Sequence, residues 1–277
     1  MKLVTKILAA AAGLMVGTMS QAAIVTQWNA ETTGEWLKEL GPPPTPTPST
    51  VQVLDGGLRL SWGTGTFGPS SLVITNPEGP EVLKTYEGGG TPPGGFIADS
   101  LTLTHYNNPI TATTPSSSLS LATLSVSLKL TPTLPVEEAA GQQDLGAFIY
   151  HIKFLETPNQ TPCADTTPGA SICNDIFVLV EGVLNQPWFY EDHWYYINAF
   201  PKQEGALKTL DDEVCQAAGA ANGCIGFTTR ERDDNQLPFG LTISTAPLSV
   251  PEPAGLALVG LALAGAGLAR RRVTQAV

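Results

Sequence analysis

Short β-type segments separated by turn residues are the feature that most constrains how this 277-residue chain can fold. Residues 119–130 nearly keep, and residues 147–156 strictly keep, the two-residue apolar period of a strand with one buried face. No long segment has the 3.6-residue apolar period of an amphipathic helix. We therefore predict an all-β fold, an antiparallel two-sheet β-sandwich (jelly-roll-like), with one short helix at about 210–218. The strands are expected at 24–30, 51–54, 58–62, 71–75, 82–86, 96–106, 119–130, 147–156, 175–181, 188–200 and 239–245.

The N-terminus has the layout of a secretory signal peptide. Lys2 and Lys6 precede an apolar stretch at 7–17, and small residues at Ser20 and Ala22 suit signal peptidase. We expect a signal helix over residues 1–22 with cleavage after Ala22, and cleavage after the next residue is the alternative. The apolar stretch is too short for a stable membrane span.

A second apolar segment lies at the C-terminus and has three parts. Proline-rich residues come first, an uncharged run at 254–269 follows, and three arginines come last. The prolines keep the first part extended, and the arginines favour a cytoplasmic C-terminus for a transmembrane helix over the apolar run. A buried core helix is the alternative, which the all-round apolarity and the arginines disfavour. The residues that define the segment are Val250, Pro251, Glu252, Pro253, Arg270, Arg271 and Arg272.

This three-part end resembles the PEP-CTERM sorting signal of exported Gram-negative bacterial proteins. The resemblance implies transient anchoring in the inner membrane, processing by an exosortase, and delivery to the cell surface or the extracellular matrix. The expected organisation is a signal peptide at 1–22, a β-sandwich domain at 23–248 and a sorting segment at 250–273. A Pro/Thr-rich linker or loop is expected at 41–50 within the domain.

The sequence Thr104-His105-Tyr106-Asn107 ends one predicted strand. The two-residue period puts His105 on the apolar face, so we interpret it as a buried histidine that ties the strand end to a loop. A ligand-binding or catalytic imidazole is the alternative. The segment resembles the signature of the THxN family of PEP-CTERM proteins, with Thr104, His105 and Asn107 at its fixed positions. That resemblance implies localisation and one shared domain, and no activity.

The charge balance bears on the partners, and the cysteines bear on cross-linking. The net charge of −11 argues against nucleic acid as a partner, because an acidic body repels phosphates.

Export makes disulfides the default for the four cysteines, and three pairings are possible. We favour the two local pairings, each of which would staple one loop; a zinc site is the alternative, although no Cys-x2-Cys spacing occurs. The favoured pairs are Cys163–Cys173 and Cys215–Cys224.

Residues 188–200 hold the densest aromatic cluster of the chain. If they form one strand, every second side chain shares a face, which would suit sugar stacking if that face were exposed. Packing into the core is the favoured alternative. The candidate glycan-binding residues are Trp188, Tyr190, Asp192, Trp194 and Tyr196.

Other motifs carry little functional information. The GxGxxG sequence at 63–68 leads toward another strand, so we interpret it as a glycine turn rather than a dinucleotide site. The three histidines lie on separate strands, and the Asp-Asp-Asn sequence at 233–235 is a solvated turn in our interpretation, or a weak Ca²⁺ loop in the alternative. We assign no catalytic residue, metal ligand or cofactor.

These features together predict a non-enzymatic, exported protein of the cell surface or exopolysaccharide matrix, structural or adhesive in role. A carbohydrate-binding module using residues 188–196 is the second hypothesis. A secreted hydrolase ranks lower, as does an ice-binding protein using Thr102 and Thr104.

Overall fold

Strands make up nearly all of the regular structure. The computed structural model describes residues 23–37, 51–88, 90–110, 118–136, 141–157, 162–165, 173–181, 185–202 and 208–248. Within these residues it has 14 strands, one short α-helix and two 3-10 turns, so the predicted all-β class is confirmed. The predicted signal helix, the Pro/Thr-rich segment and the C-terminal sorting helix lie outside the described residues. Among the described residues, no helix is long and apolar enough to cross a membrane.

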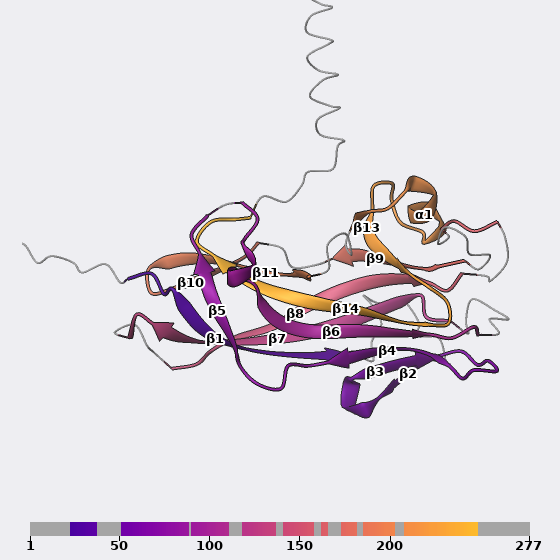
Figure 1. Ribbon diagram of the computed structural model, residues 1–277, viewed down its shortest axis with the longest axis horizontal. Coiled ribbons are helices and arrows are strands. Elements are labelled where there is room, and N and C mark those ends of the chain that lie inside the picture. The colour runs from indigo at the N-terminus through magenta and orange to yellow at the C-terminus, as the bar shows by residue number, and fades with distance from the viewer. Residues whose placement is uncertain are drawn as a thin grey trace, which may run out of the picture.

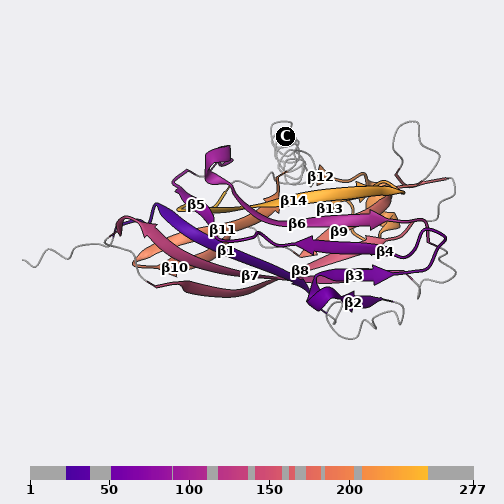
Figure 2. The same ribbon diagram turned by 60° about the horizontal axis from the view of Figure 1, so that its bottom comes forward.

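The strands form two layers whose inner faces share one apolar core (Figures 1 and 2). Leu60, Leu72 and Leu103 of one layer pack with Ile152 and Phe177 of the other. The first layer contains β12 (Lys208–Thr209), β13 (Ile225–Thr229), β9 (Asp175–Glu181), β8 (Gln143–Leu155), β7 (Leu121–Leu134) and β1 (Gln27–Trp36). The second contains β10 (Gln186–Tyr190), β11 (His193–Pro201), β14 (Asp233–Ser244), β6 (Ala98–Asn107), β4 (Ser70–Thr75), β3 (Arg59–Trp62) and β2 (Gln52–Leu54).

Strand β5 (Glu81–Tyr86) belongs to both layers. Its first four residues pair with β1, and Thr85 and Tyr86 pair with Ile243 and Ser244 of β14. The β5–β14 pairing is parallel, whereas the other strand pairings of the described residues are antiparallel. The prediction of two separate, wholly antiparallel sheets is therefore wrong in this detail. One mixed sheet turns from layer to layer through β5, as strands at the corners of sandwiches do.

The aromatic segment at 188–200 is a hairpin of β10 and β11, and the prediction of a single strand is wrong. Glu191 and Asp192 form its two-residue turn, with φ of 44° and 61°. Positive φ at both central residues is the geometry of a type I′ turn, whose twist matches that of the flanking strands. Such turns usually carry Asn and Gly, so the Glu-Asp sequence gave no signal of a break. Strands β12 and β13 also went unpredicted.

Helix α1 (Asp212–Ala217) confirms the predicted short helix, and Figure 1 shows it beside β9 and β13. Asp212 and Glu213 occupy its first turn, where negative charge is favourable. Val214 and Cys215 pack against β9. The disulfides are Cys163–Cys173, with a Cα–Cα distance of 5.2 Å, and Cys215–Cys224, with 5.7 Å, so the favoured pairing is confirmed.

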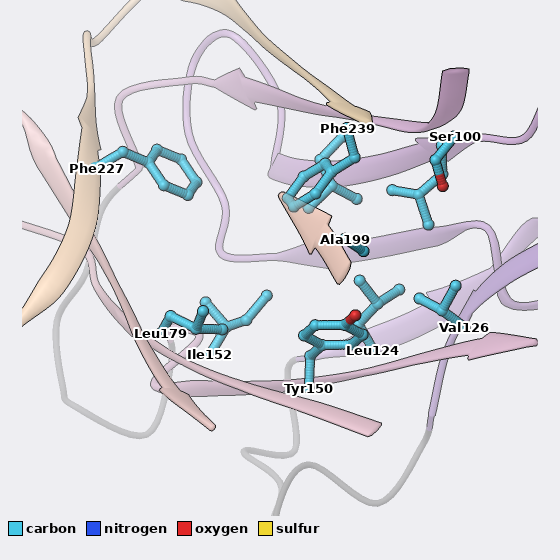
Figure 3. A pocket seen from close by; sticks show the side chains of 11 residues that line it. Ser100, Leu124, Val126, Tyr150, Ile152, Leu179, Ala199, Phe227 and Phe239 are labelled. Carbon is cyan, nitrogen blue, oxygen red and sulfur yellow. The ribbon is translucent and has the colours of Figure 1, made fainter. Parts of the chain in front are cut away.

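The middle of the core contains a small apolar cavity (Figure 3). Tyr150, Ile152 and Leu124 line it from the first layer, and Ala199 and Phe239 face them from the second. Its volume is about 50 Å³, far below the about 300 Å³ at which ligand pockets begin. The cavity is therefore a packing defect between the layers, too small for a sugar ring.

Candidate functional site

His105 lies near the end of β6 and is 2% exposed, as the strand alternation predicted. Its ring stacks on Trp62 and meets the rings of Phe154 and Phe177 edge-on. Its Nδ1 lies 2.9 Å from Oγ1 of Thr229 on β13, so the ring ties the two layers together. Burial lowers the pKa of His105 to about 3, which keeps the imidazole neutral.

Asn107 is the last residue of β6 and is 1% exposed. Its backbone oxygen accepts a 2.8 Å hydrogen bond from the backbone N–H of Arg232. Among the described residues, neither its side-chain oxygen nor its side-chain nitrogen has a hydrogen-bond partner. A buried amide without partners costs about 1–3 kcal/mol, which calls for an explanation. Thr104 alternates to the opposite face of β6 and is also buried.

Three carboxylates lie together beside these residues. Glu156 directly follows β8, Asp175 begins β9, and Glu231 lies in the turn between β13 and β14. One ligand oxygen from each lies within 4.8 Å of the others. Glu156 and Asp175 are buried and Glu231 is half-buried. We call this group the carboxylate cluster.

Hydrogen bonds fix one oxygen of each buried member of the carboxylate cluster. Trp62 Nε1 donates to Glu156 Oε2 at 2.9 Å. Thr157 donates to Asp175 Oδ1 through its backbone N–H at 2.8 Å and its hydroxyl at 3.3 Å. The second oxygens, Glu156 Oε1 and Asp175 Oδ2, have no hydrogen-bond partner in the described part of the chain.

The environment opposes ionisation of the cluster. Burial raises the pKa of Glu156 to about 7; the Trp62 hydrogen bond opposes the rise, and the charge of Glu231 adds to it. Burial, followed by the charge of Glu156, raises the pKa of Asp175. No Lys or Arg of the described residues forms a salt bridge with either carboxylate. Like charges this close are costly unless a proton or a cation joins them.

The strand registers bring Asn107 to the same place. On the inner face of the first layer, Phe154 and Phe177 contact the His105 ring, and the next inward row continues with Glu156, Asp175 and Thr229. Thr229 of that row also contacts His105. On the second layer, Trp62 pairs with Ser70, and the next strand continues that row at Asn107, two residues after His105. The Trp62–Glu156 hydrogen bond joins the two rows. Asn107 therefore faces the carboxylate cluster across the core.

The hairpin turn divides the five candidate glycan-binding residues, so the prediction that they share one face is wrong. Trp188 and Tyr190 turn inward against Trp28, with ring centroids 5.3 and 5.5 Å from it. Trp194 is 54% exposed and pairs with Phe189, which is 52% exposed, at a centroid distance of 5.1 Å. Asp192 lies in the exposed turn and Tyr196 is half-buried. The exposed ring pair is therefore Phe189 and Trp194, because the two-residue turn shifts the alternation.

A polar surface groove of about 440 Å³ lies over β5, β6 and the middle of β14. Glu78, Glu81 and Asp99 line it, and Lys202 forms a salt bridge with Asp99. Phe239 is the one aromatic ring of its lining. Sugar sites use flat rings for stacking, so the groove fits a saccharide less well than the exposed ring pair does.

The remaining motifs are structural. Residues 63–68 connect β3 to β4, and Gly63 and Gly68 have positive φ, so the predicted glycine turn is confirmed. Asn235 accepts a hydrogen bond from the Arg230 N–H and donates to the Arg230 and Asp233 carbonyls, so it organises a turn. In the described part of the chain the carboxylate cluster is the group with metal-ligand geometry, and it contains no histidine.

The chain leaves the sandwich at a defined point. Strand β14 ends at Ser244, and Asn185 then holds the backbone of Leu248. Its Nδ2 donates to the Leu248 carbonyl at 2.9 Å, and its Oδ1 accepts from the Leu248 N–H at 2.7 Å. A single amide thus satisfies both backbone groups, as a paired strand would.

The described residues form an all-β fold that ends at the clamped Leu248. Residues 249–272 match the model of the PEP-CTERM protein-sorting motif. The chain carries this motif and is an exported protein that an exosortase processes. A comparison with curated proteins finds no match to the chain.

Proposed function

We propose that this chain is a non-enzymatic surface or matrix protein, structural or adhesive in role and associated with exopolysaccharide. Signal peptidase removes residues 1–22, the C-terminal segment is held transiently in the inner membrane, and exosortase cleavage delivers the sandwich to the cell surface. Thr104, His105 and Asn107 mark it as a member of the THxN family in this proposal. The observation that carries the proposal is the sorting motif at 249–272, which follows the anchored Leu248 directly.

The geometry of both ends of the domain supports this order of events. Val25 and Trp28 are fully buried, so the fold begins within a few residues of the predicted cleavage site. The Asn185 clamp on Leu248 separates the folded body from the motif. A processing enzyme needs access to the motif, and the clamp ends the described body at the residue before it.

The character of the interior supports a non-enzymatic role. His105 is enclosed by three aromatic rings and kept neutral, which suits packing more than proton transfer. The cavity between the layers is apolar and holds about 50 Å³. Catalytic sites instead gather polar groups in a pocket that the substrate can enter.

Fractionation of cells with intact-mass analysis tests the sorting route. The native protein is compared with a Pro251→Ala/Pro253→Ala variant and with Pro80→Ala, a control at an exposed turn proline. We expect a wild-type surface or matrix species that starts near Ala23 and lacks the three arginines, and an unprocessed double variant in the inner membrane. A wild-type protein that keeps its arginines in the inner membrane would contradict the proposal and indicate a permanently tethered domain.

A carbohydrate-binding module is the second candidate, because Phe189 and Trp194 present two adjacent exposed rings on one hairpin face. Rings in this arrangement stack on the apolar faces of sugars. Delivery to an exopolysaccharide matrix would bring such a ligand within reach.

Affinity electrophoresis in gels that contain the cells' exopolysaccharide tests the second candidate. We expect retardation of the wild type, loss of retardation in Phe189→Ala/Trp194→Ala, and no change in Val82→Ala. Val82 is a matched control because it is 54% exposed on β5. Equal mobility of all three proteins with and without polysaccharide would exclude glycan binding by this hairpin.

A further inference from the structure

We propose that Glu156, Asp175, Glu231 and Asn107 form a Ca²⁺ site between the two layers, next to His105. The inference goes beyond the surface role proposed above, since it concerns an ion that the domain binds. It assigns a function to the buried polar residues that the packing of a sandwich does not need.

The spacing of the carboxylates fits a calcium ion. Their ligand oxygens lie within 4.8 Å of one another. Calcium binds oxygen at about 2.3–2.6 Å, so two ligands on opposite sides of one ion are about 5 Å apart. Three carboxylate oxygens at this separation can contact one ion together without rearrangement of the backbone.

The hydrogen bonds leave the required atoms available. One oxygen of Glu156 is bonded to Trp62 and one oxygen of Asp175 to Thr157, which orients both groups. The second oxygen of each has no hydrogen-bond partner, although both residues are at least nine-tenths buried. Groups that hold ligands in place are the usual surroundings of a metal site.

Asn107 is the independent observation that points to a ligand. It is 1% exposed, and neither atom of its amide has a hydrogen-bond partner in the described part of the chain. The strand registers put it on the inner face, in the row of Trp62, whose indole binds Glu156 of the carboxylate cluster. A cluster of acids that merely shared protons would not need a neutral amide oxygen. Calcium does use such oxygens, since amide and carboxylate oxygens together complete its six to eight ligands.

The charge and the access route also fit a divalent cation. No cationic side chain of the described residues forms a salt bridge with Glu156 or Asp175, so a cation there would meet no competing positive charge among these residues. Glu231 is half-buried, so the cluster reaches the solvent on its side. Oxygen ligands without thiolate or imidazole select calcium or magnesium, and four protein side chains around one ion favour calcium, because magnesium keeps most of its waters.

The first experiment measures metal content and thermal unfolding of the full chain purified in detergent. We expect about one Ca²⁺ per chain before chelation and a melting temperature that rises by about 5–10 °C when saturating CaCl2 replaces EDTA. Asp175→Asn keeps the shape and removes one charge, so it should abolish the rise. Glu213→Gln, an exposed carboxylate of α1, should keep it.

Terbium luminescence reports ion binding directly, and carboxylates that served only the packing of the fold would not produce it. Trp62 touches Glu156, so excitation of tryptophan should sensitise Tb³⁺ in the site, and added Ca²⁺ should quench the emission. Trp62→Phe should remove the sensitised emission and, because it also removes the hydrogen bond that orients Glu156, reduce the Ca²⁺-dependent rise. If Asp175→Asn fails to fold, Glu231→Gln at the rim replaces it, with weaker Ca²⁺ affinity expected.

Three results would overturn the assignment. A wild-type chain without bound metal whose melting temperature is the same in EDTA and CaCl2 would show that the carboxylates share protons instead. An equal rise in wild type and Asp175→Asn would place the ion elsewhere, and a rise with MgCl2 alone would exclude calcium as the ion. None of these results bears on exosortase processing, because the sorting experiment does not depend on metal.

Discussion

Two groups of buried polar and aromatic side chains lie at opposite ends of strand β6 and are built in opposite ways. The tryptophan cluster, formed by Trp28, Trp188, Tyr190 and Tyr195, packs with Ala98 at the start of β6. The carboxylate cluster lies beside the end of β6. Figure 1 agrees with this separation, since β10 and β5 lie toward one end of the molecule and β9 and β13 toward the other.

The polar atoms of Trp28 and Tyr195 in the tryptophan cluster belong to one continuous chain of hydrogen bonds. Trp28 Nε1 donates to Thr85 Oγ1 at 3.0 Å, and the Thr85 hydroxyl donates to the Val25 carbonyl. The Val25 N–H in turn donates to the Tyr195 hydroxyl at 2.9 Å. These bonds join β1 to β5, β5 to the N-terminal segment, and that segment to β11. This region therefore stabilises the fold.

At the carboxylate cluster, by contrast, several buried polar atoms have no hydrogen-bond partner in the described part of the chain. Glu156 and Asp175 each keep one oxygen without a partner, and both amide atoms of Asn107 are unbonded. Such groups cost free energy, and proteins retain them where a bound species repays the cost. The comparison therefore separates a region that holds the sandwich together from a region that weakens it in return for a ligand.

Truncation of the tryptophan cluster should have the largest effect on stability. Trp28→Ala removes a fully buried ring that contacts three other rings, so we expect a loss of about 3–5 kcal/mol in the free energy of unfolding. Urea denaturation followed by tryptophan fluorescence measures it. A loss below about 1 kcal/mol would mean that this region does not stabilise the fold as described.

Glu156→Gln should change how stability depends on pH in EDTA. Between the ordinary pKa of 4.5 and the folded value of about 7, the folded protein keeps a proton that the unfolded chain has released. The protonated Glu156 therefore adds at most about 3 kcal/mol to the free energy of unfolding. This contribution is complete below pH 4.5 and is lost as the pH rises through 7.

Urea titrations from pH 4.5 to 8 measure this dependence in both proteins. The wild-type stability should fall more steeply with pH than that of the variant, and Ca²⁺ should flatten the wild-type curve. His105 acts in the opposite direction, because its lowered pKa makes stability rise with pH up to about 6.5, and it does so equally in both proteins. Parallel curves would contradict the electrostatic account of the carboxylate cluster.

Asn107→Leu should stabilise the chain when no cation is present. The substitution replaces a buried amide without partners by an apolar side chain of similar size, which we expect to add about 1–2 kcal/mol in EDTA. The same variant should gain less than the wild type from Ca²⁺. Destabilisation in EDTA would show that the Asn107 amide contributes to the fold itself.

Trp194→Ala should have the smallest effect on stability. The ring is 54% exposed and lies on the outer face of the β10–β11 hairpin, so we expect a change below about 1 kcal/mol. Trp188→Ala, on the inner face of the same hairpin, should cost several times more, because that ring packs against Trp28. Equal losses would mean that both faces of the hairpin are buried.

Strands with clear alternation were predictable, and turns without glycine were not. Phe148, Tyr150, Ile152 and Phe154 identified β8, and Leu101, Leu103 and His105 correctly placed a histidine on the inner face of β6. The Glu191-Asp192 turn was missed because neither residue is the glycine or asparagine that usually indicates positive φ. Because of that turn, Trp188 and Trp194 lie on opposite faces of the hairpin and not on one shared face.

The sequence by itself determined the strand-rich class and the sorting segment, because each depends on residues that are neighbours along the chain. It favoured the local disulfide pairs, and the structure decided between the three possible pairings. Only the tertiary structure decided that β5 joins the layers and that Glu156, Asp175, Glu231 and Asn107 meet. These residues come from three strand ends and one turn that are far apart in sequence. Their meeting depends on strand register and layer packing, which no local pattern encodes.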